Sequence, residues 1–266
     1  ARGDYAFFVS NDMLFDKNLI KQLYNFCETK KDVGIATVKM LKHVNNKKTN
    51  IIDSMGANID VFCCADSINI HKNLKKVTDK NQEIFFAFGG ALFIKSKLFR
   101  YVGGYDERYF TLTDDIDLCW RVNLLGYKTK YIKSSYLHHK VSGTLAKTHN
   151  RHVKRFFSER NNLCSMLKNY SLLSLFAILP FYFVINLLES LFFVLLLKLK
   201  LSLVPFKAIL WNIHNLRNTI QKRKFIQKNR KVSDFEIFKI IKFIPQKFIY
   251  GYEFIFNRKI WKNYMD

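Results

Sequence analysis

Three carboxylates, Asp114, Asp115 and Asp117, lie within five residues at the start of a segment with helical periodicity. A helix dipole stabilises acidic side chains in its first turn, so one interpretation is that these residues cap the helix. Three acids are more than a cap needs. Like charges at short range raise the pKa of one member, and a carboxylate with a raised pKa suits a general base. The cluster therefore indicates a candidate base, with capping as the alternative.

A single carboxylate, Asp12, directly follows the apolar run Tyr5–Val9, which we interpret as a buried strand. In open α/β sheets ligands bind beyond the carboxyl ends of strands, and an acid there can hold a divalent cation that bridges a diphosphate. An isolated Asp in this place also forms turns or caps helices. His138 and His139 end another strand-like segment, where an imidazole could complete a metal site or simply lie on the surface.

Strands that alternate with helices would position these residues. The apolar runs predict strands at 5–9, 33–40, 84–88, 91–94 and 128–132, and helices at 19–26, 96–101 and 114–125. Gly89 and Gly90 separate two of the strands and permit either a tight turn or a close approach of the backbone to a ligand. We therefore predict an α/β domain with a mostly parallel sheet over residues 1–150.

Composition limits the class of protein. The chain has 266 residues, of which 49% are hydrophobic, so it can bury a large core and is not a disordered polyelectrolyte. Its five cysteines include no Cys-x-x-Cys pair, which favours reduced thiols. The net charge of +23 is uneven, because residues 1–150 contribute +8 and residues 151–266 contribute +15. The second part therefore indicates an anionic partner, either anionic lipid or nucleic acid.

Residues 151–266 predict a helical, basic and apolar tail. Residues 169–197 contain no Lys or Arg and one acid, Glu189, and as a helix would span about 43 Å. This run is either a buried pair of helices or a membrane segment, spanning or interfacial, and its length favours the membrane. Seven basic residues follow within 217–231, and Phe-rich residues 235–256 predict an interfacial helix. We expect membrane with anionic lipids rather than nucleic acid, because a nucleic-acid groove does not need an apolar run.

An ordered set of short fragments runs through residues 1–170. The fragments are Gly3–Asp12, Asp32–Ile35, Phe88–Ile94, Val102–Glu107, Asp114–Arg121, Gly126-Tyr127, Tyr136–His139, Glu159–Asn162 and Lys168–Tyr170. In this order they resemble a known family, the family 2 inverting glycosyltransferases of GT-A fold and rhamnosyltransferase-like, membrane-associated type. Each fragment is weak alone, but the ordered set is specific, and the resemblance covers most of residues 1–170.

The resemblance implies a metal and donor site. Asp12 matches the last acid of the family's DxD-type motif, which holds Mg²⁺ or Mn²⁺ against the diphosphate of the donor. Asn11 matches the variable middle position of that motif, where it would contact the donor. Ser10 stands where an acid or amide is usual, which implies altered metal affinity. His138 matches a His near the end of the catalytic domain, a possible metal contact, with His139 as the fallback.

The same resemblance implies the catalytic residues. Asp114 and Asp115 match the family's Glu-Asp pair, in which Asp115 would be the base that deprotonates the acceptor hydroxyl. Asp117 is expected to contact donor or acceptor. The run Gly89, Gly90 and Ala91 matches the wall that approaches the donor sugar and the acceptor.

The expected function is therefore transfer of a sugar, with inversion, from a nucleotide-sugar to a lipid-linked or glycan acceptor. The catalytic domain is expected at the cytoplasmic face of the cell membrane. Family members carry two βα units for the base and ribose ahead of the segment that matches residue 1, so we expect a partial GT-A domain. The chain would then be part of a longer enzyme. The alternative is a non-catalytic, membrane-bound partner subunit, which Ser10 favours.

Overall fold

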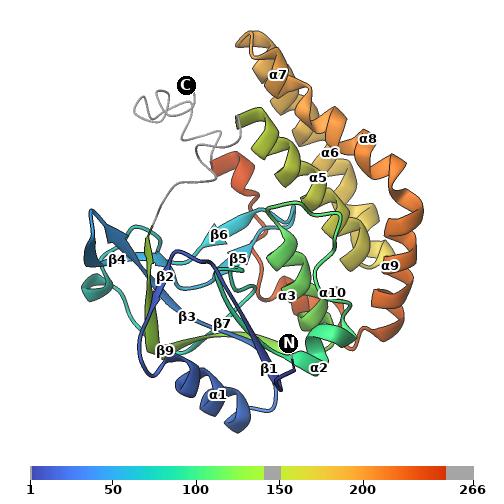
Figure 1. Cartoon of the computed structure of the whole chain (residues 1–266). Helices are drawn as coiled ribbons and strands as arrows, with labels where there is room; N and C mark the ends of the chain where they lie inside the picture. Colours follow the sequence, from blue (N-terminus) through green and yellow to red (C-terminus); the bar gives the residue numbers. More distant parts are fainter. Residues whose placement is uncertain (1, 141–150, 250–266) are drawn as a thin grey trace.

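A computed structural model of the protein describes residues 2–140 and 151–249. Helices cover both faces of a seven-stranded sheet with the order β1-β8-β3-β9-β2, in which β4 also pairs with β3 and β7 with β9 (Figure 1). β5 and β6 form a separate two-stranded sheet. The strands are β1 (Tyr5–Val9), β2 (Met13–Phe15), β3 (Val33–Val44), β4 (Lys47–Ser54), β5 (Ala57–Ile59), β6 (Ala65–Ser67), β7 (Gln82–Ile84), β8 (Ala91–Lys95) and β9 (Lys128–Lys140).

The prediction of a mostly parallel sheet is wrong. Among the described strands only β3 and β9 are parallel neighbours, and the other pairs of the main sheet are antiparallel. One reason lies in residues 43–50, where Asn45 and Asn46 have φ of 50° and 58°. Two consecutive left-handed residues make the turn of a tight hairpin, so β4 folds straight back along β3. The α/β class itself is confirmed.

Three helices pack directly on the sheet: α1 (Leu19–Thr29), α2 (Ser96–Tyr101) and α3 (Asp114–Leu124). Successive residues of β3 face opposite sides, as the period of a strand requires. Ile35 lies in one hydrophobic cluster with Leu118 of α3, and Ala36 lies in another with Leu23 of α1. The sheet thus separates α1 from the helix that carries the acidic cluster. β1 lies at an edge of the sheet and stays partly exposed, although its sequence predicts burial on both faces.

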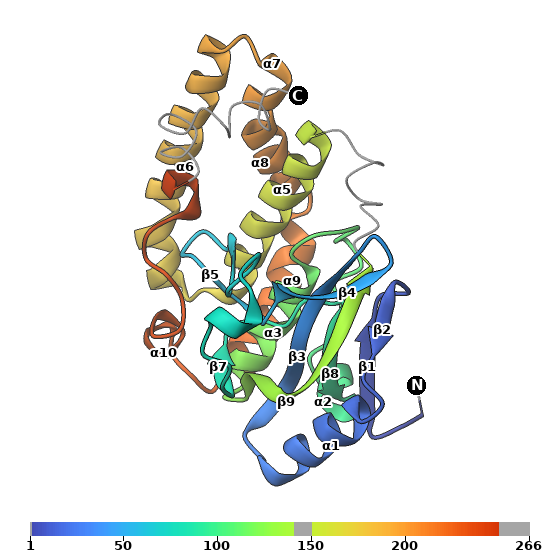
Figure 2. The ribbon, with the colours of Figure 1, turned by 90° about the vertical axis from the view of Figure 1, so that its left-hand side faces the viewer.

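The second part of the chain is helical, and α6, α7 and α8 form a hairpin with α7 at its tip (Figures 1 and 2). The helices are α5 (Arg151–Asn169), α6 (Leu172–Leu195), α7 (Leu199–Ser202), α8 (Val204–His214), α9 (Leu216–Asn229) and α10 (Asp234–Phe238). A 3₁₀ turn, η1 (Leu74–Lys76), lies in the first part. Of the predicted helix at 235–256, residues beyond 249 lie outside the described part, and residues 239–245 are not helical.

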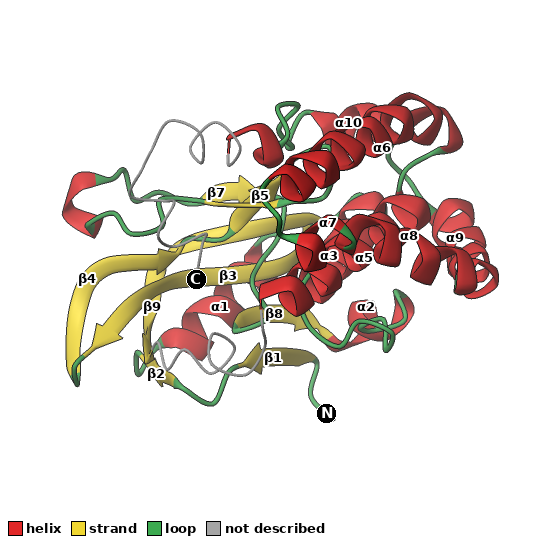
Figure 3. Ribbon diagram, turned by 90° about the horizontal axis from the view of Figure 1, so that it is seen from above, coloured by secondary structure: helices red, strands yellow, loops and turns green. Residues whose placement is uncertain are grey.

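One hydrophobic cluster joins the two parts of the chain. Trp120 of α3 lies in it together with Tyr170, Ile226 and Ile237 from beyond residue 150. The helices of the second part lie together at one end of the sheet when the molecule is seen from above (Figure 3). The predicted domain boundary at residue 150 lies outside the described residues. The two parts on either side of it share one hydrophobic core.

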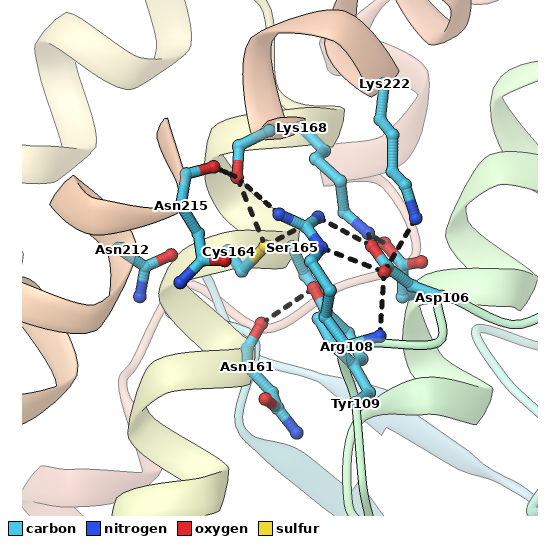
Figure 4. A network of polar contacts seen from close by, with 12 residues as sticks. Asp106, Arg108, Tyr109, Asn161, Cys164, Ser165, Lys168, Asn212, Asn215 and Lys222 are labelled. Carbon is cyan, nitrogen blue, oxygen red and sulfur yellow. Dashed lines mark hydrogen bonds and ion pairs between the residues drawn. The ribbon is translucent and has the colours of Figure 1, made fainter. Parts of the chain in front are cut away.

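A buried network of charges fastens α3 and the loop before it to α5 and α9, and Figure 4 shows its part around Asp106. The ammonium of Lys168 on α5 lies 2.7 Å from a carboxylate oxygen of Asp106 and 2.9 Å from one of Asp117 on α3. Arg121 pairs with Asp117 at 2.9 Å, while Lys222 of α9 pairs with Asp106 at 2.7 Å. Burial alone would raise the pKa of both carboxyls, but the neighbouring cations outweigh it and lower the pKa values below the ordinary range. Both acids therefore stay ionised inside the protein.

We expect Lys168→Met to lower the free energy of unfolding by about 3–5 kcal/mol, because it leaves two buried carboxylates without their shared cation. Lys222→Met is the matched control. Its side chain is 38% exposed and Asp106 keeps two other cations, so we expect a loss of less than about 1 kcal/mol. Denaturant unfolding of both variants measures the difference, and equal losses would contradict the role given to Lys168.

Candidate active site

Asp115 lies in the first turn of α3, where its carboxylate accepts hydrogen bonds from the backbone N–H of Gly89, at 3.2 Å, and of Ile116, at 2.8 Å. Burial and then the neighbouring carboxylate of Asp114 raise the pKa of Asp115 to about 7, against the lowering effect of these two hydrogen bonds. Burial also raises the pKa of Asp114. A carboxylate that titrates near neutral pH can accept a proton from a reacting group and release it afterwards.

The backbone just before this helix is strained. Leu112 and Thr113 have φ of 63° and 68°, a region that non-glycine residues rarely adopt, least of all a β-branched one. Helix α5 holds them there: the side-chain amide of Asn161 donates to the carbonyls of Thr111, at 2.9 Å, and Leu112, at 2.7 Å. The amide of Asn162 lies 2.8 Å from the hydroxyl of Thr113. Strain of this kind persists where surrounding contacts impose it, and here it sets the direction in which α3 begins.

The turn at Gly89 and Gly90 connects Asp115 with the end of β1. A Cβ on Gly90 would come within 2.9 Å of the terminal methyl of Met13 and 3.2 Å of the hydroxyl of Ser10, so a larger residue at 90 would displace these two side chains. A Cβ on Gly89 would meet Asp115 at 4.0 Å, an ordinary contact. Asp115 and the turn after β1 therefore lie on either side of this double glycine.

Ala91 and Asn11, two further residues of the expected site, differ in burial. Ala91 is buried at the start of β8, where its carbonyl accepts a 2.6 Å hydrogen bond from the hydroxyl of Thr37. This bond fixes the strand that follows the double glycine. Asn11 is exposed in the turn after β1.

Asp12, His139 and Asp53 form a row of hydrogen-bonding groups at the end of β9. The Nε2 atom of His139 lies 3.2 Å from a carboxylate oxygen of Asp12, and its Nδ1 lies 2.7 Å from one of Asp53 on β4. The strand register brings them together, because Met13 of β2 pairs with His139. The hydrogen bond with Asp53 raises the pKa of His139, and this effect outweighs burial, which would lower it.

Of the expected metal contact, His138, and its fallback, His139, the structure places only His139 beside Asp12. Successive residues of β9 point to opposite faces, so His138 faces away from Asp12 and is buried. Burial, with the nearby Lys48 and His43, lowers its pKa. Its Nδ1 atom has no hydrogen-bond partner among the described residues.

Asp117 does not face the candidate site, so the expected contact with donor or acceptor is not supported. It lies on the buried side of α3, where Arg121, Lys168 and the amide of Asn169 bind both of its oxygens. The spacing explains this: two residues along a helix turn the side chain about 200° away from Asp115. Asp117 anchors the helix that carries Asp115.

Sequence reasoning missed three residues near the site. Asp53 supports His139, Asn161 holds the turn before α3, and Tyr105 lies beside Gly89. Burial raises the pKa of Tyr105, so its phenol stays neutral near the two acids. Asn161 and Tyr105 lie in fragments that carry the family resemblance, but the resemblance gives these two residues no role, and no motif in the sequence singles out Asp53.

The residues around Asp12 fit a divalent cation held jointly by protein and ligand. Among the described residues no group of three or more His, Cys, Asp or Glu side chains is clustered enough to hold a metal alone. Asp12 and His139 offer one carboxylate and one imidazole, and Asp53 bonds the other ring nitrogen, as carboxylates behind metal-bound histidines do. Hard cations with few protein ligands take the rest of their oxygens from phosphate and water.

The chain is similar to known glycosyltransferases. A family profile described as "Glycosyl transferase family group 2" matches residues 7–213, from β1 into α8. An N-acetylglucosaminyl-diphospho-decaprenol L-rhamnosyltransferase of Mycobacterium tuberculosis is 40% identical over 57 residues, covering 21% of this chain and 19% of that protein. Rhamnosyltransferase WbbL of Escherichia coli is 29% identical over 94 residues, covering 34% of this chain and 36% of WbbL.

The chain belongs to the family 2 glycosyltransferases, because the profile spans most of its length. The predicted resemblance is thus confirmed. The chain matches only about a fifth to a third of the length of the curated relatives. A crystal structure of GalNAc-T7 with UDP, GalNAc and Mn²⁺ is 11% identical, with a TM-score of 0.46, covering 62% of this chain and 32% of that one. That likeness is too weak to assign a fold.

The raised pKa of Asp115 has a consequence for stability. The folded protein binds this proton up to a pH of about 7, whereas the unfolded chain releases it near pH 3.9. Between these values stability falls as the pH rises, and the cost is complete above pH 7. We expect Asp115→Asn to be more stable than the wild type by about 1–3 kcal/mol at pH 8, and no more stable near pH 4.

Thermal unfolding of the two proteins at both pH values measures this difference. A gain in stability that is the same at both pH values would show that Asp115 carries no raised pKa.

Proposed function

We propose that the protein transfers a sugar, with inversion, from a nucleotide-sugar to an acceptor hydroxyl, with Asp115 as the base. The observation that carries the proposal is a carboxylate with a pKa of about 7 that lies across the double glycine turn from Ser10 and Met13, which flank Asp12, the partner of His139. A base and a diphosphate site on opposite sides of one turn leave the sugar between them. We take the arrangement to be GT-A-like, as the sequence predicts.

In this reaction the acceptor oxygen attacks the anomeric carbon from the face opposite the diphosphate. Asp115 takes the hydroxyl proton as the new carbon–oxygen bond forms. The bond from the anomeric carbon to the phosphate oxygen breaks, and the nucleoside diphosphate leaves with its electron pair. Asp114 assists by keeping the pKa of its neighbour high. A single displacement of this kind inverts the anomeric centre.

Asp12 and His139 would hold Mg²⁺ or Mn²⁺, which would supply positive charge beside the diphosphate that leaves. Asp53 would keep the imidazole of His139 in the orientation and tautomer that a metal ligand needs. Asn11, in the same exposed turn, would contact the donor.

The proposed acceptor is lipid-linked or a growing glycan, at the cytoplasmic face of the membrane. Two observations support it: a curated relative acts on a diphospho-decaprenol-linked sugar by its name, and α6 is apolar and long enough to cross a membrane by length and composition. A nucleotide-sugar is a cytosolic metabolite, which assigns the catalytic part to that face. The basic second part would bind anionic lipid.

A non-catalytic partner of a complete transferase is the second candidate. The observation that favours it is Ser10, whose hydroxyl stands where the family usually has a further acid or amide. The two candidates differ in whether the natural full-length protein turns over when Asp115 is intact.

In the natural full-length protein we expect Asp115→Asn to lower kcat by about 10² or more with little change in donor binding, because the amide cannot accept the proton. The wild-type kcat should rise with pH up to about 7, as the base ionises. Asp32→Asn, a 53% exposed carboxylate, is the control and should behave as wild type. Near-normal turnover of Asp115→Asn would remove the base and favour the non-catalytic partner.

Mn²⁺ binding in the presence of a nucleoside diphosphate tests the metal site without reference to turnover. We expect Asp12→Ala to abolish Mn²⁺ binding, and Asp53→Asn to weaken it about 10–100-fold through loss of the support for His139. His138→Gln faces the other side of β9 and should bind Mn²⁺ normally. Electron paramagnetic resonance of free Mn²⁺ gives the affinities, and a stronger effect at His138 than at Asp53 would contradict this site.

A further inference from the structure

In helix α6 the polar side faces the protein and the apolar side faces outward, the opposite of a helix on the surface of a soluble protein. All of its exposed residues are apolar, and they include Leu173, Phe176 and Leu195, which are 82%, 78% and 81% exposed. Its polar residues point inward, where Ser174, Tyr182, Asn186 and Ser190 are buried and Glu189 is half-buried. A helix with its polar side packed on protein and a wholly apolar outer side needs an apolar occupant for that outer side.

The inner side of α6 is bound to the protein along most of its length. The hydroxyl of Tyr182 donates to Glu159 of α5 at 3.2 Å, and Glu189 pairs with Arg155 of α5 at 2.6 Å. Lys247 lies between the helices, 2.6 Å from Glu159 and 3.1 Å from Glu189. Its side chain is only 10% exposed, so this ionic cluster is part of the folded interior.

These contacts decide how α6 can meet a membrane. If α6 crossed a bilayer, Tyr182 and Glu189 would lie in or near the hydrocarbon and would draw Arg155, Glu159 and Lys247 in with them. Charged side chains at that depth cost several kcal/mol each. α5 would follow, although it packs against α3 and the turn before Asp115. A helix lying in the plane of one leaflet avoids this cost, because only its outer side leaves water.

Charge favours lipid over a second copy of the chain as the occupant. Residues 151–249 contain 18 basic and 4 acidic residues. Each of these four acids, Glu159, Glu189, Asp234 and Glu236, already has a cationic partner. Two copies docked by the outer side of α6 would bring two strongly basic helical parts close together, whereas anionic headgroups would neutralise their charge.

We infer that α6 is a monotopic membrane anchor that lies in the plane of one leaflet, with its outer side in lipid and its polar side on the protein. The inference rests on the membrane association in the proposed function and adds its geometry: both ends of α6 stay at one depth and on the side of the catalytic part.

The test attaches an environment-sensitive fluorophore to single introduced cysteines, Leu173→Cys, Val184→Cys and Leu195→Cys, near the start, middle and end of α6. The full chain is mixed with vesicles of phosphatidylcholine and phosphatidylglycerol. Ile20→Cys on α1, also exposed, is the control site, and the parent chain gives the labelling background of its five free cysteines. Lipids with quenchers at different depths, and iodide added outside, report position.

We expect similar quenching of all three α6 sites by a shallow lipid quencher, and quenching of Ile20→Cys by iodide alone. A middle site quenched mainly by the deepest lipid, with Leu195→Cys shielded from outside iodide by the bilayer, would show a spanning helix and overturn the inference while leaving membrane association intact. No binding to vesicles would overturn both. A lipid-free dimer that shields all three sites and does not bind vesicles would replace lipid by a second copy.

A charge variant gives an independent measurement. Leu188→Glu, at a 59% exposed position on the outer side of α6, should lower partitioning into these vesicles about tenfold or more. Ile20→Glu, at a 53% exposed position on α1, adds the same charge elsewhere and should partition as the parent does. Equal effects of the two substitutions would show that net charge, and not the outer side of α6, governs binding.

Discussion

The structure depends on one buried ammonium, that of Lys168, placed between the carboxylates of Asp106 and Asp117. Asp117 belongs to the helix that carries the candidate base, Asp106 to the loop before it, and Lys168 to the first helix of the second part. None of the three charges is tolerable in the interior alone. Sheet, base and helical part are therefore obliged to fold together.

The same helix holds two carboxylates in opposite states. Burial and the neighbouring carboxylate of Asp114 raise the pKa of Asp115. The cations of Lys168 and Arg121 lower the pKa of Asp117 and keep it ionised. The two residues differ by two positions in sequence and by the face of the helix in space. Environments that separate two pKa values in this way divide the labour between a reactive group and a structural one.

Sequence predicted the strands and helices around the site well, because β1, α2, α3 and the core of β3 have clear apolar periods. It singled out Asp12 and Asp115, and the fold brings Asp115 and the turn that contains Asp12 to either side of one glycine turn. It failed where the answer depended on partners distant in sequence. The choice between His138 and His139 required the register of β9 on β2, and the role of Asp117 required Lys168, 51 residues away. The predicted strand direction was wrong, because the tight turn at Asn45 and Asn46 brings β4 back antiparallel to β3.

The left-handed backbone at Leu112 and Thr113 also has a meaning for how this sequence can change. The amide of Asn161 grips main-chain carbonyls and not side chains, so the identity of residue 112 is free only while that amide is present. A related chain that replaced Asn161 would relieve the turn most easily with glycine at 112, since glycine adopts this φ without steric cost. We therefore expect positions 112 and 161, on a loop and a helix 49 residues apart, to vary together among related chains.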